Sequence, residues 1–196
     1  MTTRAADDHC GPFLLLEPMS KLSVTKPLQM PMIESILRPA TLADLPAINA
    51  IYNHYVLTST ATYQTVPSTS EARLAWFTGR DTTRHPVTVL EKAGEVVAWG
   101  SLSPFAERGA FAGTVENSIY VHPDHHRKGL GRSLLLDQLE RAHAAGHHTI
   151  IAAISSEQAA SITLHLAHGF SEAGRLRECG RKFDQWLDLV YLQRLL

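Results

Sequence analysis

The residues with the clearest chemical potential lie between residues 116 and 132. Gly129 and Gly131 are separated by one residue and lie between an expected strand and a helix with a leucine stripe. Glycines at such a turn let backbone N–H groups converge on a phosphate, and the helix start adds the positive end of its dipole. Three cations lie within reach of the same anion: Arg127, Lys128 and Arg132. The pattern predicts a phosphate-binding loop, and a plain strand-to-helix turn is the alternative.

Glu116 is the second candidate, five residues before the end of the strand that leads into this loop. If burial raises the pKa of its carboxyl group toward neutrality, the carboxylate can serve as a general base, directly or through a water. The alternative is an edge-strand glutamate that faces solvent.

Other chemistries fit the chain less well. The sequence has no Gly-x-x-x-x-Gly-Lys-Ser/Thr, and no Gly-x-Gly-x-x-Gly followed by an acidic residue, so nucleotidases with a P-loop and dinucleotide folds are disfavoured. Eleven histidines suggest a metal, but the densest group, His122, His125 and His126, has no Cys or Glu spaced to complete a tetrahedral set. We therefore predict no metal site.

Composition narrows the classes further. The charge is 18 Lys and Arg against 19 Asp and Glu, which argues against a chain that coats nucleic acid or an anionic membrane. No apolar run approaches the roughly 18–20 residues of a membrane span. Two cysteines cannot form a disulfide framework. We expect a cytoplasmic protein with neither a nucleic-acid nor a membrane partner.

The elements that must position these residues follow from periodicity and turn residues. A capping box at Ser68–Glu71 should open a short helix with Leu74 and Phe77 on one face, and Ala93-Gly94 should join two strands in a hairpin. The expected strands are 36–38, 87–90, 96–102, 114–121, 149–154, 170–172 and 186–192, and the expected helices are 45–55, 68–77, 129–145 and 158–168. This is one mixed α/β domain with about seven strands and four helices.

The first 35 residues differ from the rest. They contain Pro12, Pro18, Pro27 and Pro31 and show neither a helical nor an alternating period. We expect residues 1–35 to form a flexible N-terminal extension, or to precede a working start at Met30 or Met32, and residues 36–196 to form the domain.

The stretch from Glu116 to Leu135 resembles the acetyl-CoA pyrophosphate loop of the GNAT family of N-acetyltransferases. The family pattern, Gln/Arg-x-x-Gly-x-Gly/Ala, reads His126-Arg-Lys-Gly129-Leu-Gly131 here, with His at the first position. Further stretches are similar to the phosphinothricin and methionine sulfone/sulfoximine branch: Asn53-His-Tyr-Val56, Thr114-Val-Glu116 and Gly180-x-Lys182-Phe183-Asp-x-Trp186. The resemblance implies a GNAT fold, with a mostly antiparallel seven-stranded sheet flanked by about four helices.

The resemblance also implies acetyl-CoA as the acetyl donor and assigns residues to it. The backbone of Ile119, Tyr120 and Val121 should pair with the pantetheine arm, with the Val121 N–H as an oxyanion donor. Gln158 stands where relatives carry Asn and should contact the same arm. The pyrophosphate should be held by His126, Arg127, Lys128, Gly129, Leu130, Gly131 and Arg132.

The remaining roles concern catalysis and the acceptor. The resemblance supports Glu116 as the base, and His165, where many relatives carry Tyr, is either the acid that protonates the leaving thiolate or a packing residue. Arg108 could clamp an acceptor carboxylate or phosphinate, and Tyr63 either closes over the substrate or packs in the core. Ala106 and Phe111 replace a basic residue and a Tyr of the branch, which removes two polar contacts.

Together these features predict acetyl transfer from acetyl-CoA to a small amino-acid-like amine of the phosphinothricin or methionine sulfone/sulfoximine type. The alternatives are a non-catalytic acyl-CoA sensor and an acetyltransferase for a protein or polyamine amine. The resemblance also implies a homodimer through the C-terminal region, where Trp186, Leu189 and Tyr191 could serve the interface or the core.

Overall fold

A computed structural model describes residues 35–196 of the chain. The predicted N-terminal extension therefore lies outside the described residues, except for Ser35. One seven-stranded sheet runs through the described part in the order β1-β2-β3-β4-β5-β7-β6. Its strands are β1 Ser35–Pro39, β2 Val87–Lys92, β3 Glu95–Pro104, β4 Thr114–Val121, β5 Thr149–Ser155, β6 Ser171–Lys182 and β7 Gln185–Leu195. The β4–β5 pair is parallel and the other five pairs are antiparallel.

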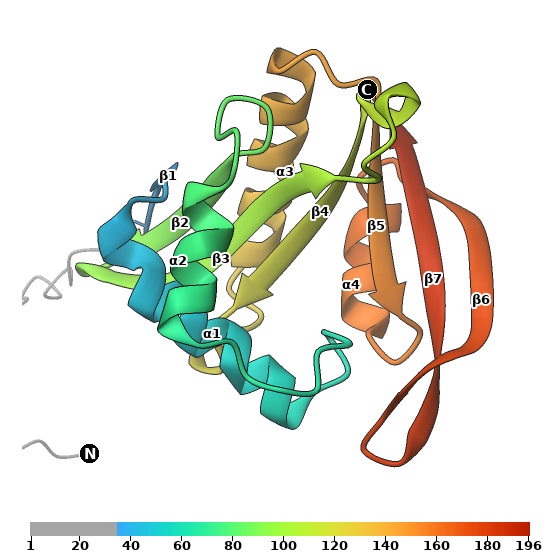
Figure 1. The fold of residues 1–196 in the computed structure, drawn as a ribbon, viewed down its shortest axis with the longest axis horizontal. Helices are drawn as coiled ribbons and strands as arrows, with labels where there is room; N and C mark the ends of the chain where they lie inside the picture. The colour runs from blue at the N-terminus through green and yellow to red at the C-terminus, as the bar shows by residue number, and fades with distance from the viewer. Residues whose placement is uncertain (1–34) are drawn as a thin grey trace, which may run out of the picture. The chain divides into compact units, whose positions relative to one another are not determined.

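Four α-helices cover the sheet: α1 Leu45–Thr58, α2 Ser70–Thr78, α3 Leu130–Ala144 and α4 Ala159–Leu166. Figure 1 shows α1 and α2 in front of the β2–β4 half of the sheet, with α3 behind that half and α4 behind β5, while none of these four helices lies in front of β5, β7 and β6. The predicted mixed α/β fold, with seven strands and four helices, is confirmed.

The two faces of the sheet bury different cores. Behind the sheet, aliphatic side chains such as Val115, Leu135 and Ile150 are fully buried. In front, the core is aromatic, and Trp99 stacks on Tyr120 with ring centroids 4.8 Å apart. Neighbouring residues of a strand point to opposite faces, and β5, whose central residues Ile150–Ile154 are all apolar, is buried on both sides, as its apolar run predicts.

The predicted hairpin is also present, since β2 pairs with β3 around a turn at Ala93 and Gly94, both with positive φ. The short helix differs from its prediction. Its N-cap is Thr69, whose hydroxyl accepts from the Ala72 N–H, and Leu74 is 46% exposed. Arg73 faces the core instead, because its guanidinium packs over aromatic rings of the front core.

The last two strands are longer than predicted. Pairing between β6 and β7 extends from Ser171–Gln193 to Lys182–Gln185, with two irregularities in register. β6 contains many charged residues and shows no alternation of apolar and polar side chains, so its sequence carries little strand signal. Hydrogen bonds to the edge of β7 that faces away from β5 make β6 a strand.

Candidate functional site

β4 and β5 separate in the middle of the sheet. They pair only through Thr114–Thr149, Val115–Ile150 and Glu116–Ile151, and beyond Glu116 the two strands diverge (Figure 1). The other edge of β4 stays paired with β3 as far as Val121. Backbone groups of alternate residues point to opposite edges, and the His122 N–H donates to Val97 on the β3 side. The N–H groups of Ile119 and Val121 therefore face the divergence, where an extended ligand can pair with them.

Glu116 stands at the point where the strands part. Its neighbour Val115 points into the rear core, so Glu116 lies on the front face, between Ser103 of β3 and Ile151 of β5. Burial raises the pKa of the Glu116 carboxyl group. Within residues 35–196, no side chain or N–H group hydrogen-bonds to this carboxylate. A partly buried carboxylate with a raised pKa is the arrangement that a general base requires.

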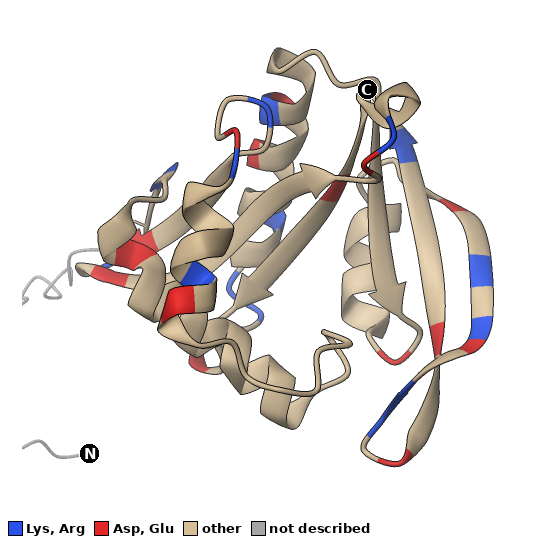
Figure 2. Cartoon of the chain, viewed as in Figure 1, with Lys and Arg blue, Asp and Glu red and all other residues tan. Residues whose placement is uncertain are grey.

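The loop between β4 and α3 presents backbone donors to solvent. Gly129 is the N-cap of α3 with φ +79°, and a Cβ there would meet nothing within 4 Å. Arg127 and Arg132 are exposed on either side of it. Lys128 instead donates to the Asp124 carbonyl at 2.7 Å, which closes the loop. Figure 2 shows basic residues gathered at this loop, so the uncapped helix start is ready to receive an anion.

Leu130 and Gly131 form the first turn of α3. The Leu130 side chain is buried, so only its backbone can serve a ligand. A Cβ on Gly131 would lie 3.5 Å from Leu164, an ordinary contact within the protein.

His126 turns away from the loop toward the end of β4. Its Nε2 atom lies 2.7 Å from the Tyr55 hydroxyl and 3.1 Å from the Val121 carbonyl oxygen, and the Tyr55 hydroxyl donates to the same carbonyl. Burial raises the pKa of Tyr55 to about 12, so its hydroxyl stays a donor. Sequence reasoning missed Tyr55, because its spacing in α1 marked it only as part of an apolar stripe.

The structure shows the surroundings of three further residues that were predicted to bind the acetyl donor: Tyr120, Gln158 and Val121. The Tyr120 side chain packs in the front aromatic core. The Gln158 amide donates to the Thr60 hydroxyl at 3.0 Å, which links the start of α4 to the segment after α1. Val121 lies five residues beyond Glu116, about 17 Å along the strand. The two residues cannot both act at one carbonyl carbon, so the Val121 N–H is not the oxyanion donor of a reaction at Glu116.

His165 is buried, and both of its ring nitrogens are engaged. Nε2 accepts from the Asn117 amide at 3.0 Å, which leaves Nδ1 to donate to the Ser161 carbonyl at 2.8 Å. Burial lowers the pKa of His165, which favours this neutral form. The ring has no free N–H to give to a leaving thiolate, so the contacts favour the packing role.

The two predicted acceptor residues lie apart from each other. The Tyr63 hydroxyl donates to the Asp188 carbonyl at 3.0 Å, and its ring lies so close to Gly180 that a Cβ there would clash. Tyr63 therefore packs against the β6–β7 hairpin. Arg108 is exposed at the start of a 3-10 turn, Gly109–Phe111, in the β3–β4 connection.

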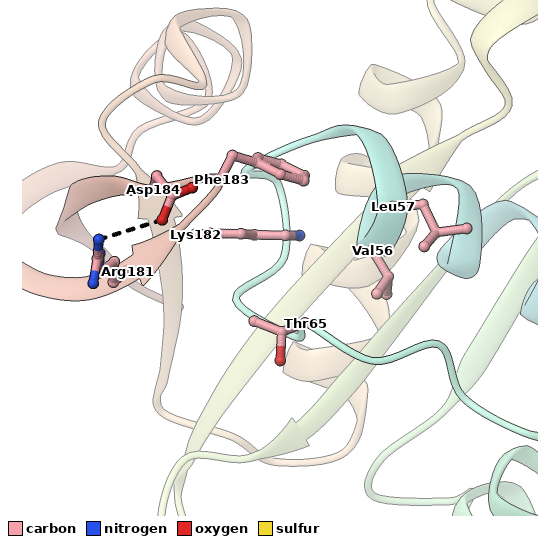
Figure 3. Close-up of a pocket in the computed structure, with 7 residues that line it drawn as sticks. All are labelled: Val56, Leu57, Thr65, Arg181, Lys182, Phe183 and Asp184. Atoms are coloured by element: carbon pink, nitrogen blue, oxygen red, sulfur yellow. Dashed lines mark hydrogen bonds and ion pairs between the residues drawn. The ribbon is translucent and has the colours of Figure 1, made fainter.

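Two pockets lie near these elements. The larger, of about 410 Å³, lies between the end of α1 and the turn of the β6–β7 hairpin, where Figure 3 shows Lys182 extending toward α1. The smaller, of about 260 Å³, lies on the open front of the sheet and is lined by Phe105, Ile151, Ala173, Gly174 and Tyr191. Only the smaller one includes a register partner of Glu116, namely Ile151.

Two further observations bear on the partners. Within residues 35–196, no three His, Cys, Asp or Glu side chains gather closely enough to hold a metal ion. The described helices include none that is long and apolar enough to cross a membrane.

Comparison with known proteins identifies a family to which a chain with these features belongs. The acetyltransferase (GNAT) family matches residues 48–170. The chain belongs to this family. It is therefore an acyltransferase of the GNAT fold, and the resemblance expected from its sequence is confirmed.

Individual relatives of the chain are also acyltransferases. An L-methionine sulfoximine/L-methionine sulfone acetyltransferase of Pseudomonas paraeruginosa is 44% identical over 80% of this chain and 92% of its own length. An L-amino acid N-acyltransferase of Escherichia coli is 40% identical over 80% and 91%. The crystal structure of a GNAT phosphinothricin acetyltransferase from Sinorhizobium meliloti with acetyl-CoA has a TM-score of 0.80 at 35% identity, and covers 83% of this chain and 88% of that one.

Proposed function

We propose that this protein transfers the acetyl group of acetyl-CoA to the amine of a small amino-acid-like acceptor, of the phosphinothricin or methionine sulfone/sulfoximine type. The observation that carries the proposal is the position of Glu116. This carboxylate lies where β4 and β5 part, next to the unpaired strand edge and on the open front of the sheet. A donor molecule along the edge and an acceptor on the front would meet there.

The donor binds along one continuous surface in this proposal. The N–H groups of Ile119 and Val121 pair with the pantetheine arm as an added strand would. The pyrophosphate lies over the N–H groups at the start of α3, around Gly129, with Arg127 and Arg132 beside it. His126 and Lys128 shape the loop through their contacts with Val121 and Asp124.

The chemistry assigned to Glu116 is proton removal. Its carboxylate takes a proton from the acceptor's ammonium group, and the freed amine attacks the thioester carbonyl carbon. The C–S bond then breaks, and the thiolate takes up a proton from solvent or from the acceptor nitrogen. Arg108 is the exposed cation of the β3–β4 connection and is assigned to an acceptor carboxylate or phosphinate.

The test combines turnover and binding. Free CoA thiol is measured with a panel of amino acids and their sulfone, sulfoximine and phosphinate analogues. Glu116→Gln should lower the rate at neutral pH by about 10²–10⁴-fold, the usual contribution of a general base, and leave acetyl-CoA affinity by calorimetry unchanged. Glu107→Gln, at an exposed glutamate of the neighbouring connection, is the control and should retain full activity.

Two results would contradict the proposal. Unchanged turnover in Glu116→Gln would remove the base assignment. Acetyl-CoA binding without thiol release for any acceptor would favour the non-catalytic sensor.

We also propose that the protein is a cytoplasmic homodimer that pairs through β6 and β7. Large apolar side chains are exposed there, with Trp186 at 61% and Leu176 at 47%. Leu189 and Tyr191 are half-buried on the same hairpin. Light scattering should give a dimer for the wild type and a monomer for Trp186→Lys, and a monomeric wild type would refute the dimer.

A further inference from the structure

The end of β4 is held by two side chains from different parts of the chain. The His122 N–H donates to the Val97 carbonyl on β3, so the backbone groups of Val121, one residue earlier, point the other way, to the free edge of β4. The Tyr55 hydroxyl donates to the Val121 carbonyl, and His126 Nε2 lies 3.1 Å from the same oxygen. The end of this free edge is therefore tied both to α1, which lies next to it in Figure 1, and to the anion loop.

One assignment of protons satisfies this group of three. The Tyr55 hydroxyl has a single proton, which it gives to the Val121 carbonyl. Its oxygen lies 2.7 Å from His126 Nε2 and can only accept there, so Nε2 carries a proton. Burial raises the pKa of Tyr55 to about 12, which keeps the hydroxyl protonated at neutral pH. The neutral and the charged imidazole both supply the Nε2 donor, so the network does not depend on the charge of His126.

The Tyr55 ring is fixed by its neighbours. It packs against the Tyr120 ring, with centroids 5.7 Å apart, and against the His54 ring edge-on at 5.4 Å. The His126 ring stacks on it at 6.3 Å, with 20° between the two planes. Tyr55 is half-buried, whereas His126 is exposed. A packed aromatic ring thus presents the hydroxyl to an exposed residue of the loop.

The anion loop needs such contacts because part of its backbone is strained. Arg127, directly after His126, has φ +57°, a left-handed conformation that costs free energy for a residue other than glycine. Gly129 follows at φ +79° as the N-cap of α3. Lys128 ties the loop to itself, whereas Tyr55 reaches it from a separate helix.

We propose that Tyr55 is a positioning residue for acetyl-CoA. Its hydroxyl, through His126 and the end of β4, holds the anion loop in the conformation that receives the pyrophosphate. This inference rests on the proposed placement of acetyl-CoA along β4 and at the start of α3. A loop that is already held in its binding conformation loses less entropy when the ligand arrives, so affinity rises without a further contact. The effect of Tyr55 therefore falls on acetyl-CoA binding and not on the acceptor.

The first experiment removes only the hydroxyl. Tyr55→Phe keeps the ring and its packing. We expect the Kd of acetyl-CoA in calorimetry and the KM for acetyl-CoA to rise about two- to tenfold, the equivalent of one hydrogen bond. The KM for the acceptor, and kcat at saturating acetyl-CoA, should not change. Tyr52→Phe is the matched control on the same helix, because the Tyr52 hydroxyl lies 3.0 Å from the Thr62 hydroxyl, and it should leave the Kd of acetyl-CoA unchanged.

The second experiment tests whether the effect passes through His126. His126→Ala removes the group that Tyr55 holds and should weaken acetyl-CoA binding by a similar factor. His126→Gln supplies an amide N–H in place of the ring donor and should recover most of the affinity. Because His126 is exposed, both variants are expected to keep the fold, and they test the inference even if Tyr55→Phe does not fold. Wild-type affinity in His126→Ala would contradict the inference.

Unchanged acetyl-CoA affinity in Tyr55→Phe would also overturn it. So would tighter binding, since the hydroxyl would then compete with acetyl-CoA for the Val121 carbonyl. An equal rise in the KM for the acceptor would indicate a general structural role instead. The outcomes separate this inference from the proposed function. A wild type that does not bind acetyl-CoA refutes the proposed site, whereas a wild type and a Tyr55→Phe variant that bind it equally well refute only the role of Tyr55.

Discussion

Lys182 should stabilise the fold through the end of α1. Its Nζ atom is buried and donates to three backbone carbonyls, those of Ser59 at 2.6 Å, Thr62 at 2.8 Å and Tyr55 at 3.3 Å. The Ser59 and Thr62 carbonyls lie at and beyond the C-cap of α1, where helical partners are lacking, while the Tyr55 carbonyl also accepts from the Ser59 N–H. The ammonium also faces the negative end of the helix dipole. Lys182→Met keeps most of the aliphatic stem and removes the donor.

The magnitude follows from these contacts. A hydrogen bond to a charged group contributes about 1.5–3 kcal/mol, and two of the three bonds are short. Against this stand the hydration that the ammonium lost on burial and the water that can reach the freed carbonyls through the adjoining pocket of about 410 Å³. We expect a net loss of about 2–4 kcal/mol in the free energy of unfolding, and a Tm lower by roughly 4–16 °C.

The assay is thermal melting followed by circular dichroism, with urea titration to obtain the free energy of unfolding. Arg181→Met is the matched control, because the Arg181 side chain is 58% exposed and contacts two exposed side chains, Asp184 through an ion pair and Trp186 through its ring. The control should shift the free energy of unfolding by no more than about 0.5 kcal/mol. If Lys182→Met melts no lower than Arg181→Met, the three carbonyl contacts contribute nothing and the reasoning is wrong.

Three further predictions concern the site. Because burial raises the pKa of Glu116 above 4.5 and a base acts unprotonated, kcat/KM should fall as pH drops through that raised value, and Glu116→Gln should abolish this limb. Gly129→Ala, at φ +79°, should cost about 1–2 kcal/mol in urea titration and weaken acetyl-CoA binding in calorimetry, while unaltered binding would exclude the loop. His165→Leu should lower the free energy of unfolding by about 1–3 kcal/mol, since the Asn117 amide loses its acceptor, and a lost pH limb would restore His165 as the acid.

Much of the proposed donor site could be located from the sequence because its parts are close along the chain. Glu116 and the glycines of the anion loop lie within sixteen residues, on a strand, a turn and a helix start that local signals identify. The acceptor side could not be predicted in this way. Phe105, Ile151, Gly174 and Tyr191 come from four separate segments, and each alone reads as ordinary core.

The same distinction explains what the sequence left wrong or open. Leu74 and Phe77 both fit a helical stripe, yet Arg73 packs over the rings of the front core and Leu74 is left exposed. For His165 the sequence left an acid and a packing residue as alternatives, and only the structure shows that Asn117, 48 residues away, contacts its Nε2 atom. Such outcomes depend on which segments meet, and the hydrophobic period of one segment contains no information about its partners.

The sequence by itself determined the order of helices and strands, the anion loop and the carboxylate upstream of it, because these depend on local periodicity, capping and turn residues. The tertiary structure alone decided where β4 parts from β5, that Tyr55 and His126 meet at Val121, and that an apolar pocket adjoins Glu116. Each of these depends on contacts between residues distant in the chain, and such contacts exist only after the sheet and its helices have packed.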